Sequence, residues 1–180
     1  MPIGSFAILP DVINELIKVK PKTILDLGCG FGIYGVAVRE WLELGYNENG
    51  WNIYIEGVEA FQKYRNPNWE HYDKIIVGDI LKVNFDRKYD AILLLDVIEH
   101  FEKEIGRKLI EQIKKLLNPG GILLVGTTAI FCKQDAVYGN EFERHRSLWT
   151  IDDFKDFEII KDGKMDKYGH YMLLTKYIKR

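Results

Sequence analysis

The segment that decides the fold runs from Thr23 to Gly32 and reads Thr-Ile-Leu-Asp-Leu-Gly-Cys-Gly-Phe-Gly. Residues 23–27 have the length and apolar composition of a buried strand, and three glycines alternate directly after it. Apolar residues at helical spacing follow from Ile33 onward. Glycines between a strand and a helix let a ligand approach the backbone, and the helix amino terminus offers N–H groups. The segment therefore predicts a ligand-binding turn in an α/β sheet.

Strand and helix patterns alternate outward from this turn. They predict helices over 8–19, 33–44 and 109–117, strands over 53–58, 75–77, 91–95 and 122–125, a surface loop over 45–52, and a turn at Asn118-Pro119-Gly120-Gly121 that stops the third helix. Residues 60–72 are ambiguous, with a short helix interrupted at Pro67 as one interpretation. Strands over 156–160 and 170–175 have no helix pattern between them, so they pair antiparallel. The predicted fold is α/β, a Rossmann-like doubly wound sheet of five parallel strands plus a C-terminal antiparallel hairpin.

Composition restricts the class of protein. The chain has 180 residues, which is typical of one domain, and we expect a single domain over 1–180 with an N-terminal helix within 1–20. Lys and Arg total 25 against 27 Asp and Glu, a balance that argues against a domain held to nucleic acid by its phosphates. Cys29 and Cys132 are too few for a disulfide scaffold or a four-cysteine metal site. The sequence has no signal-peptide pattern and no membrane-spanning run, so a cytoplasmic location is expected.

The strand ends predict the charge of the ligand. Ligands of open α/β sheets bind beyond the carboxyl ends of the strands. The sequence places four acids at those ends, Asp26, Glu59, Asp79 and Asp96, and no lysine or arginine near the glycines until Arg39. A pyrophosphate would meet carboxylates without a cation, whereas a ligand with a positive centre, an amine and ribose hydroxyls would suit them. Ile33 also stands where a dinucleotide fingerprint needs its third glycine, which disfavours a nicotinamide dehydrogenase.

Five motifs in order make the prediction specific. They are Ile24 to Gly32, Gly57-Val58-Glu59-Ala60, Val77-Gly78-Asp79-Ile80, Tyr89 to Phe101 and Leu116 to Gly121. Their series, spread over residues 20–127, resembles that of class I S-adenosylmethionine-dependent methyltransferases. The resemblance implies the seven-stranded sheet of that family and S-adenosylmethionine as the cofactor.

The resemblance also implies a set of cofactor contacts. The residues at the matching positions are Asp26, Gly28, Gly30, Gly32, Glu59, Ala60, Asp79, Ile80 and Asp96. By analogy, the three glycines would pack under the methionine part, and Asp26 would order the turn. Glu59 would accept hydrogen bonds from the ribose hydroxyls, while Asp79 and the Ile80 N–H would hold the adenine. Asp96 would contact the methionine amine. Phe61 either stacks on the adenine or is an aromatic residue of the core.

The candidates for the chemistry follow strands four and five. The pattern over residues 128–149 predicts a long loop or lid, which would lie on the acceptor side of the cofactor. Within it, His145 is a candidate general base, and Arg144 and Arg146 are candidates to hold an anionic acceptor. His100 is a second candidate base at the rim of the site. The alternative is a solvated charged loop with a structural His100.

Several functions remain open from sequence alone. The favoured one is methyl transfer to an O, N or C nucleophile of a small molecule. Nucleic-acid methylation is disfavoured because Leu95-Asp96-Val97-Ile98 stands where base-directed enzymes carry an Asn/Asp-Pro-Pro-aromatic motif. A protein acceptor, or a methyltransferase-like domain that only binds a partner, stays possible by fold alone. No metal is expected, because the sequence has no local cluster of histidine and cysteine. The oligomeric state is not predicted.

Overall fold

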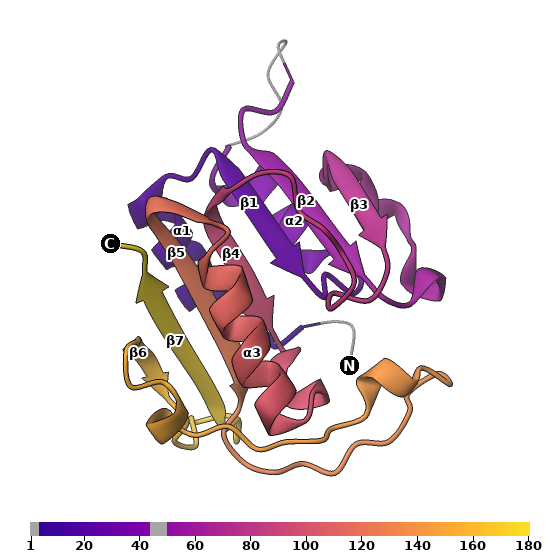
Figure 1. Cartoon of the computed structure of the whole chain (residues 1–180), viewed down its shortest axis with the longest axis vertical. Helices are drawn as coiled ribbons and strands as arrows, with labels where there is room; N and C mark the ends of the chain where they lie inside the picture. The colour runs from indigo at the N-terminus through magenta and orange to yellow at the C-terminus, as the bar shows by residue number, and fades with distance from the viewer. Residues whose placement is uncertain (1–3, 44–49) are drawn as a thin grey trace.

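The computed structural model describes residues 4–43 and 50–180. In these ranges the chain forms a seven-stranded sheet of order β3-β2-β1-β4-β5-β7-β6 (Figure 1). The strands are β1 (Thr23–Leu27), β2 (Tyr54–Glu59), β3 (Lys74–Val77), β4 (Tyr89–Leu95), β5 (Leu117–Thr128), β6 (Glu158–Asp162) and β7 (Met172–Ile178). The predicted helical residue Leu44, residues 45–49 of the predicted surface loop and residues 1–3 of the predicted N-terminal unit lie outside the described residues.

The strand directions confirm the predicted fold class. β1 pairs in parallel with β2 and β4, and the parallel set extends to β3 on one side and to β5 on the other. β7 then pairs antiparallel with β5 over Thr128↔Met172 to Ile122↔Ile178, and β6 pairs antiparallel with β7. The strand order reverses between β1 and β4. The carboxyl ends on either side of that reversal are where α/β sheets bind their ligands.

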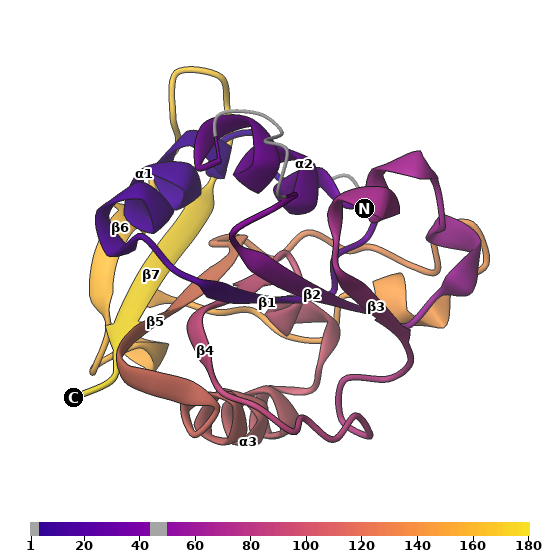
Figure 2. The same cartoon turned by 90° about the horizontal axis from the view of Figure 1, so that it is seen from above.

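Helices cover both faces of the sheet, as Figure 2 shows. α1 (Leu9–Val19) and α2 (Ile33–Trp41) lie on one face, and α3 (Lys103–Lys114) lies on the other. α1 begins with Pro10 in its first turn and turns Val12 and Leu16 into the core. α3 buries Leu109, Ile110 and Ile113 against the opposite side of the sheet. The strands are therefore apolar on both faces, as buried parallel strands require.

The crossovers on the β3 side of the sheet differ from the prediction of helices between all five strands. β2 and β3 are joined by two 3₁₀ helices, η1 (Gln62–Tyr64) and η2 (Pro67–His71). η2 begins at Pro67, and the Asn66 side chain caps it by accepting a hydrogen bond from the Asn68 N–H (2.8 Å). The segment therefore forms two separate short helices, divided before Pro67. Residues 78–88, all of them described, join β3 to β4 through a turn and extended chain without a helix.

The turn predicted at Asn118-Pro119-Gly120-Gly121 is incorrect in its position. α3 ends at Lys114, and these four residues lie inside β5. The pairing jumps from Tyr89↔Leu117 to Ala91↔Ile122, so the motif forms an irregularity in the strand. A Cβ atom at Gly121 would stand 3.0 Å from the Asp90 carbonyl oxygen, which explains the glycine.

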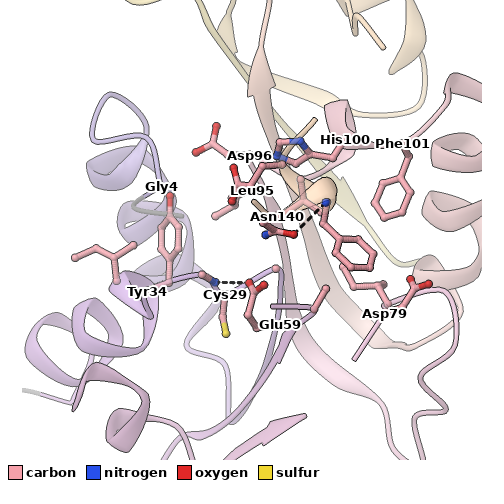
Figure 3. A pocket seen from close by; sticks show the side chains of 18 residues that line it. Gly4, Cys29, Tyr34, Glu59, Asp79, Leu95, Asp96, His100, Phe101 and Asn140 are labelled. Atoms are coloured by element: carbon pink, nitrogen blue, oxygen red, sulfur yellow. Dashed lines mark hydrogen bonds between the residues drawn. The ribbon is translucent and has the colours of Figure 1, made fainter. Parts of the chain in front are cut away.

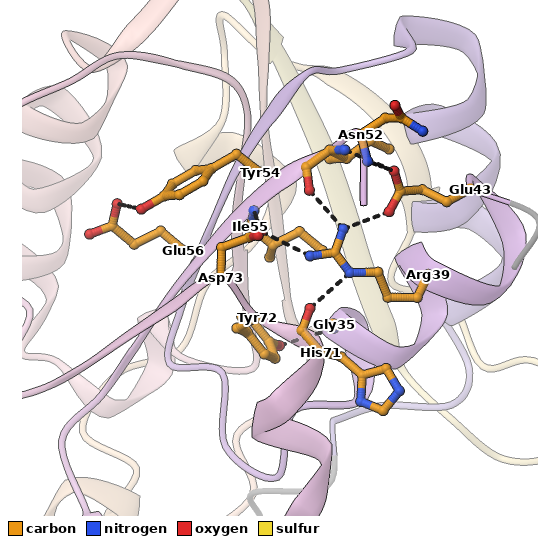
Figure 4. A network of polar contacts seen from close by, with 11 residues as sticks. Gly35, Arg39, Glu43, Asn52, Tyr54, Ile55, Glu56, His71, Tyr72 and Asp73 are labelled. Atoms are coloured by element: carbon orange, nitrogen blue, oxygen red, sulfur yellow. Dashed lines mark hydrogen bonds and ion pairs between the residues drawn. The ribbon is translucent and has the colours of Figure 1, made fainter. Parts of the chain in front are cut away.

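A buried arginine fixes the amino ends of β2 and β3 (Figure 4). Arg39 of α2 is 1% exposed. Its guanidinium donates to the His71 carbonyl (2.9 Å), the Ile53 carbonyl (2.7 Å), Glu43 Oε2 (2.6 Å) and Asp73 Oδ2 (2.9 Å). These bonds tie α2 to η2 and to the first residues of β2 and β3. They lie at the edge of the sheet opposite to the carboxyl ends.

Candidate functional site

A cavity opens at the carboxyl ends of β1, β2 and β4 (Figure 3). It encloses about 770 Å³ of space between the atoms, a volume that includes open solvent. Four acids line it, Glu59, Asp79, Asp96 and Glu143, and no lysine or arginine does so among residues 4–43 and 50–180. The expected acidic pocket is therefore present. One of its four acids differs from the prediction, because Glu143 lines the cavity and Asp26 does not.

The glycine turn forms the floor of this cavity. Gly28 and Gly30 adopt positive φ angles of 78° and 52°, which favour glycine. The N–H groups of Gly28 and Cys29 donate to the Val58 carbonyl at 2.8 and 3.0 Å. A Cβ atom at Gly28 would stand 2.4 Å from Val97 Cγ2, so no other residue fits there without rearrangement. The backbone of the turn is thus open to a ligand on the cavity side.

Gly32 and Asp26 do not line the cavity. Gly32 was predicted to pack under the cofactor, whereas Asp26 was predicted to order the turn. Gly32 caps α2 with a φ of 81°, and a Cβ atom there would meet Asn68, Trp69 and Tyr72. Asp26 is 2% exposed and accepts a hydrogen bond from the Tyr72 hydroxyl (2.6 Å), which itself accepts from the Gly35 N–H (3.0 Å). Burial raises the pKa of Asp26 to about 7, although the Tyr72 hydrogen bond acts against the shift. Asp26 thus joins β1 to the first turn of α2.

Glu59 ends β2 and points across the cavity. Its Oε2 accepts a hydrogen bond from the Gly30 N–H (2.9 Å), and its Oε1 accepts one from the Phe61 N–H (2.8 Å). Burial raises the pKa of Glu59, while these backbone donors lower it. A carboxylate accepts about four hydrogen bonds, so each oxygen keeps capacity for a ligand donor. Glu59 therefore orders the glycine turn and still faces the cavity.

Asp96 and Tyr34 bring unpaired polar atoms to the same cavity. Asp96 follows β4 with a φ of 55°, and its Oδ1 accepts a hydrogen bond from the Ser5 hydroxyl (2.9 Å). Its Oδ2 and the Tyr34 hydroxyl are buried and have no partner within the described part of the chain. Burial raises the pKa values of both groups. Buried polar atoms without partners are rare, and a ligand is one explanation for them.

The wall opposite the glycines comes from the segment after β5. Asn140, Phe142 and Glu143 line the cavity, and the Asn140 side chain caps η4 (Glu141–Glu143) by accepting from the Phe142 N–H (3.0 Å). The Tyr64 hydroxyl donates to Glu143 Oε1 (2.9 Å) and accepts from Asn140 Nδ2 (3.2 Å). These residues lie within the segment 128–149 that was predicted for the acceptor side, but no individual contact was predicted for Asn140 or Glu143. An Asn followed by Glu-Phe-Glu is a capping signal that could have located them.

Phe61 packs inside the protein and does not line the cavity. Its ring meets the Tyr64 ring edge-on, with centroids 4.9 Å apart. Ile80, Ala60 and Asp79 do line the cavity, at the ends of β2 and β3. The position of the Phe61 ring therefore agrees with the interpretation of an aromatic residue that packs against the core.

The two candidate catalytic histidines lie side by side. His100 lines the cavity, and its ring centroid is 5.0 Å from that of His145, which approaches from the segment after β5. Burial lowers the pKa of both, so each imidazole is held in its neutral form. Glu99 is 3% exposed, and its ligand oxygen and one nitrogen of each histidine lie within 4.8 Å of one another. The sequence shows no local cluster of this kind, because the residues come from the segment directly after β4 and from a distant later segment.

The predicted acceptor-binding arginines face away from the cavity. Arg146 donates to the carbonyls of His100 (2.8 Å), Arg144 (2.9 Å) and Glu141 (3.0 Å), which occupies its guanidinium. The Arg144 side chain forms an ion pair with Glu141 at 3.2 Å near the surface. Trp149 is fully buried against Phe154. The arginines therefore hold the segment in place, and an anionic acceptor has no cation from them in this structure.

Sheet, turn and cavity together define a Rossmann-like protein with an acidic cavity at the carboxyl ends of its parallel strands. The methyltransferase domain family matches residues 5–157, and the chain belongs to this family. That match confirms the resemblance found in the sequence.

Relatives and solved structures agree with this family. Norajmaline N-methyltransferase of Rauvolfia serpentina is 27% identical over 133 residues, 68% of this chain and 44% of that protein. Ubiquinone biosynthesis O-methyltransferase of Haemophilus ducreyi is 29% identical over 112 residues, 59% of this chain and 45% of that protein. The chain thus spans less than half the length of these relatives. Magnesium protoporphyrin IX methyltransferase from Synechocystis PCC 6803, solved with bound S-adenosylmethionine, shares the fold with a TM-score of 0.68, 15% identity, and coverage of 97% of this chain and 79% of that one.

No helix in the described ranges is long and apolar enough to cross a bilayer.

Proposed function

We propose that this chain is an S-adenosylmethionine-dependent methyltransferase that acts on a small-molecule acceptor. The observation that carries the proposal is the cavity beside the glycine turn, lined by four carboxylates and, among the described residues, by no lysine or arginine. S-adenosylmethionine carries an ammonium, a sulfonium, a ribose diol and an adenine amine. All of these groups are cationic or donate hydrogen bonds, so they suit carboxylate oxygens.

The residues present fit this cofactor. Asp96 Oδ2 and the Tyr34 hydroxyl are buried without a partner, and an ammonium between them would satisfy both. Glu59 keeps free lone pairs for the ribose hydroxyls, and Gly28 and Gly30 line the cavity where the methionine part would lie. Ala60, Asp79 and Ile80 would hold the adenine at the ends of β2 and β3. Asp26 and Gly32 would act from behind, by fixing the turn and the start of α2.

The bound cofactor supplies a methyl group that a nucleophile displaces from sulfur. The chain's own contribution is to orient the acceptor and to exclude water. Phe142 and Phe101 give the cavity an apolar wall, and the neutral His100 imidazole can take a proton from an acceptor hydroxyl or ammonium. His145 would act beside it. We place the acceptor between this wall and the end of β4.

A small acceptor is supported by the lining of the cavity and by the relatives. The side chains of Asn140, Phe142 and Glu143 form one wall of the cavity. The names of the two relatives above describe an N-methyltransferase and an O-methyltransferase.

The test is a titration of S-adenosylhomocysteine into the purified chain by calorimetry. We expect stoichiometric binding and at least about tenfold weaker binding to Glu59→Gln, since charge-assisted hydrogen bonds to a ribose contribute about 1.5–3 kcal/mol. Glu104→Gln, which changes an exposed acid on α3, is the matched control and should bind as the wild type does. Equal affinity in Glu59→Gln and wild type, or binding of NAD in place of S-adenosylhomocysteine, would contradict the proposal.

A further inference from the structure

The cluster of Glu99, His100 and His145 is built from two distant parts of the chain. Glu99 and His100 belong to η3 (Ile98–His100), directly after β4, and His145 belongs to the segment after β5. That segment is fastened to η3, because the N–H groups of Arg146 and Ser147 both donate to the Glu99 carbonyl, at 2.8 and 3.1 Å. The approach of His145 is therefore fixed by backbone hydrogen bonds.

Both histidines have the hydrogen bonds of metal ligands. His145 Nδ1 lies 2.6 Å from the Cys132 carbonyl oxygen, and His100 Nδ1 lies 3.4 Å from the Arg144 carbonyl oxygen. A carbonyl oxygen only accepts, so each Nδ1 carries the proton in these contacts. The Nε2 atom of each ring is then left with its lone pair. A histidine that binds a metal commonly donates its other ring N–H to a backbone carbonyl in this way.

Glu99 completes the set with a buried carboxyl group. Among the residues that the structure describes, its Oε2 has no hydrogen bond of ordinary geometry, and the Thr127 side chain lies beside it. A buried, unpaired carboxylate is costly, and a cation removes that cost. The ligand atoms of the three residues lie within 4.8 Å of one another, compared with about 3.4 Å between neighbouring ligands of a tetrahedral Zn²⁺ at about 2.1 Å. Small side-chain rotations would close this difference.

We propose that Glu99, His100 and His145 bind one divalent transition-metal ion beside the cavity. Two imidazoles and one carboxylate suit Zn²⁺ or a similar ion better than Ca²⁺ or Mg²⁺, which prefer oxygen ligands. Three protein ligands leave an open position on the metal. With the ion bound, the Nε2 lone pairs of His100 and His145 are occupied, so the two histidines then act as ligands and not as proton acceptors. Because His100 also lines the cavity, an oxygen of the acceptor is the expected ligand there, and this last step rests on the proposed function. The acceptor is then a compound with a hydroxyl or carboxylate group.

The test is a titration of Zn²⁺ into chelator-treated full-length chain, followed by calorimetry, with Co²⁺ absorption as a second signal. We expect one ion per chain in the wild type and at least about tenfold weaker binding in His145→Ala and Glu99→Gln. His71→Ala is the matched control, since His71 Nδ1 also contacts a carbonyl, Asn68 O at 3.2 Å, but at the opposite edge of the sheet. It should bind Zn²⁺ as the wild type does.

Equal Zn²⁺ affinity in His145→Ala and wild type, or no stoichiometric binding to the wild type, overturns the proposal. Circular dichroism shows whether each variant is folded, and His145→Ala decides if Glu99→Gln fails to fold. Titration of S-adenosylhomocysteine separates the two proposals. Zn²⁺ binding without S-adenosylhomocysteine binding supports the metal site and contradicts the proposed function. S-adenosylhomocysteine binding without Zn²⁺ binding overturns the metal site alone.

Discussion

Two groups of buried charges lie at opposite edges of the sheet and differ in how they are paired. At the amino ends of β2 and β3, Arg39 makes four hydrogen bonds, to Glu43, Asp73 and two carbonyls. At the carboxyl end of β4, Asp96 Oδ2 and Glu99 Oε2 are buried without a partner among the described residues. The polar atoms of the first group are hydrogen-bonded within the protein, whereas the second group has polar atoms that a ligand could pair.

This difference separates structural polar groups from binding groups. Burying a charge costs free energy unless it is paired, so a complete network such as that of Arg39 needs only the fold. Unpaired buried carboxylates weaken the fold unless a ligand offsets their cost. We therefore expect substitutions at the Arg39 network to change stability, and substitutions at the carboxyl edge to change binding. The predictions below test that division.

The largest effect is expected for Arg39→Met. The substitution leaves Glu43 and Asp73 without their cation, and breaking one side of a buried ion pair typically costs about 3–5 kcal/mol. Urea unfolding should show this loss in the free energy of unfolding. The affinity of the folded protein for S-adenosylhomocysteine should not change. A large loss of affinity in folded Arg39→Met would mean that the two groups are not independent.

The next effect is a pH dependence of stability that comes from Asp26. Burial raises its pKa to about 7 in the folded state, above the unfolded value, so the folded chain holds a proton that the unfolded chain has lost. Stability is therefore unaffected below the unfolded pKa and falls as the pH rises towards 7. The fall amounts to as much as about 4 kcal/mol, since each pKa unit corresponds to about 1.4 kcal/mol. Unfolding of Asp26→Asn should lack this slope between pH 4 and pH 7. An unchanged slope would assign the pH dependence to other groups.

Asp96→Asn should lower affinity without lowering stability. The change keeps an acceptor for the Ser5 hydroxyl, and asparagine tolerates the φ of 55°. Binding of S-adenosylhomocysteine should weaken by about 1.5–3 kcal/mol, the contribution of one charge-assisted hydrogen bond. The matched control is Asp90→Asn on the same strand. Asp90 accepts from the N–H groups of Lys22 and Thr23, so that variant should lose stability and keep its affinity. Loss of stability in Asp96→Asn together with loss of affinity in Asp90→Asn would contradict the division between structural and binding groups.

The smallest effect is expected for His71→Ala. Arg39 contacts the backbone carbonyl of His71, and Figure 4 shows the imidazole pointing away from the guanidinium. Removal of the ring should change the free energy of unfolding by no more than about 0.5 kcal/mol. A loss as large as that of Arg39→Met would show that the side chain, rather than the carbonyl, supports the network.

The sheet and most of the cofactor side were predictable from sequence because their signals are local. The glycine turn is recognised from neighbouring residues, because alternating glycines directly follow a buried strand. The acids at the strand ends can be placed together because parallel strands share one carboxyl edge. Seven of the residues predicted to contact the cofactor line the cavity, namely Gly28, Gly30, Glu59, Ala60, Asp79, Ile80 and Asp96. Gly32 and Asp26 do not, because the same motif also supplies the helix cap and a buried contact to Tyr72.

The acceptor side was less predictable because its contacts join distant segments. Tyr64 reaches Glu143 across 79 positions, and His145 meets His100 from beyond β5. No local sequence pattern predicts contacts between residues so far apart in the chain. Arg146 was predicted to bind an anionic acceptor because arginine commonly does so. A guanidinium in a loop can equally donate to backbone carbonyls of the same segment, and Arg146 does this. The position of residues 118–121 inside β5 was missed for a similar reason, since the pairing with β4 fixes it.

The central claim is that Glu59 and Asp96, at the carboxyl edge of the sheet, hold the cofactor. A crystal structure of the chain with S-adenosylhomocysteine tests it most directly. We predict the ribose hydroxyls within hydrogen-bond distance of Glu59 and the amine within about 3 Å of Asp96 Oδ2. A complex in which the ligand lies elsewhere, and in which Asp96 Oδ2 still has no partner, would contradict the account.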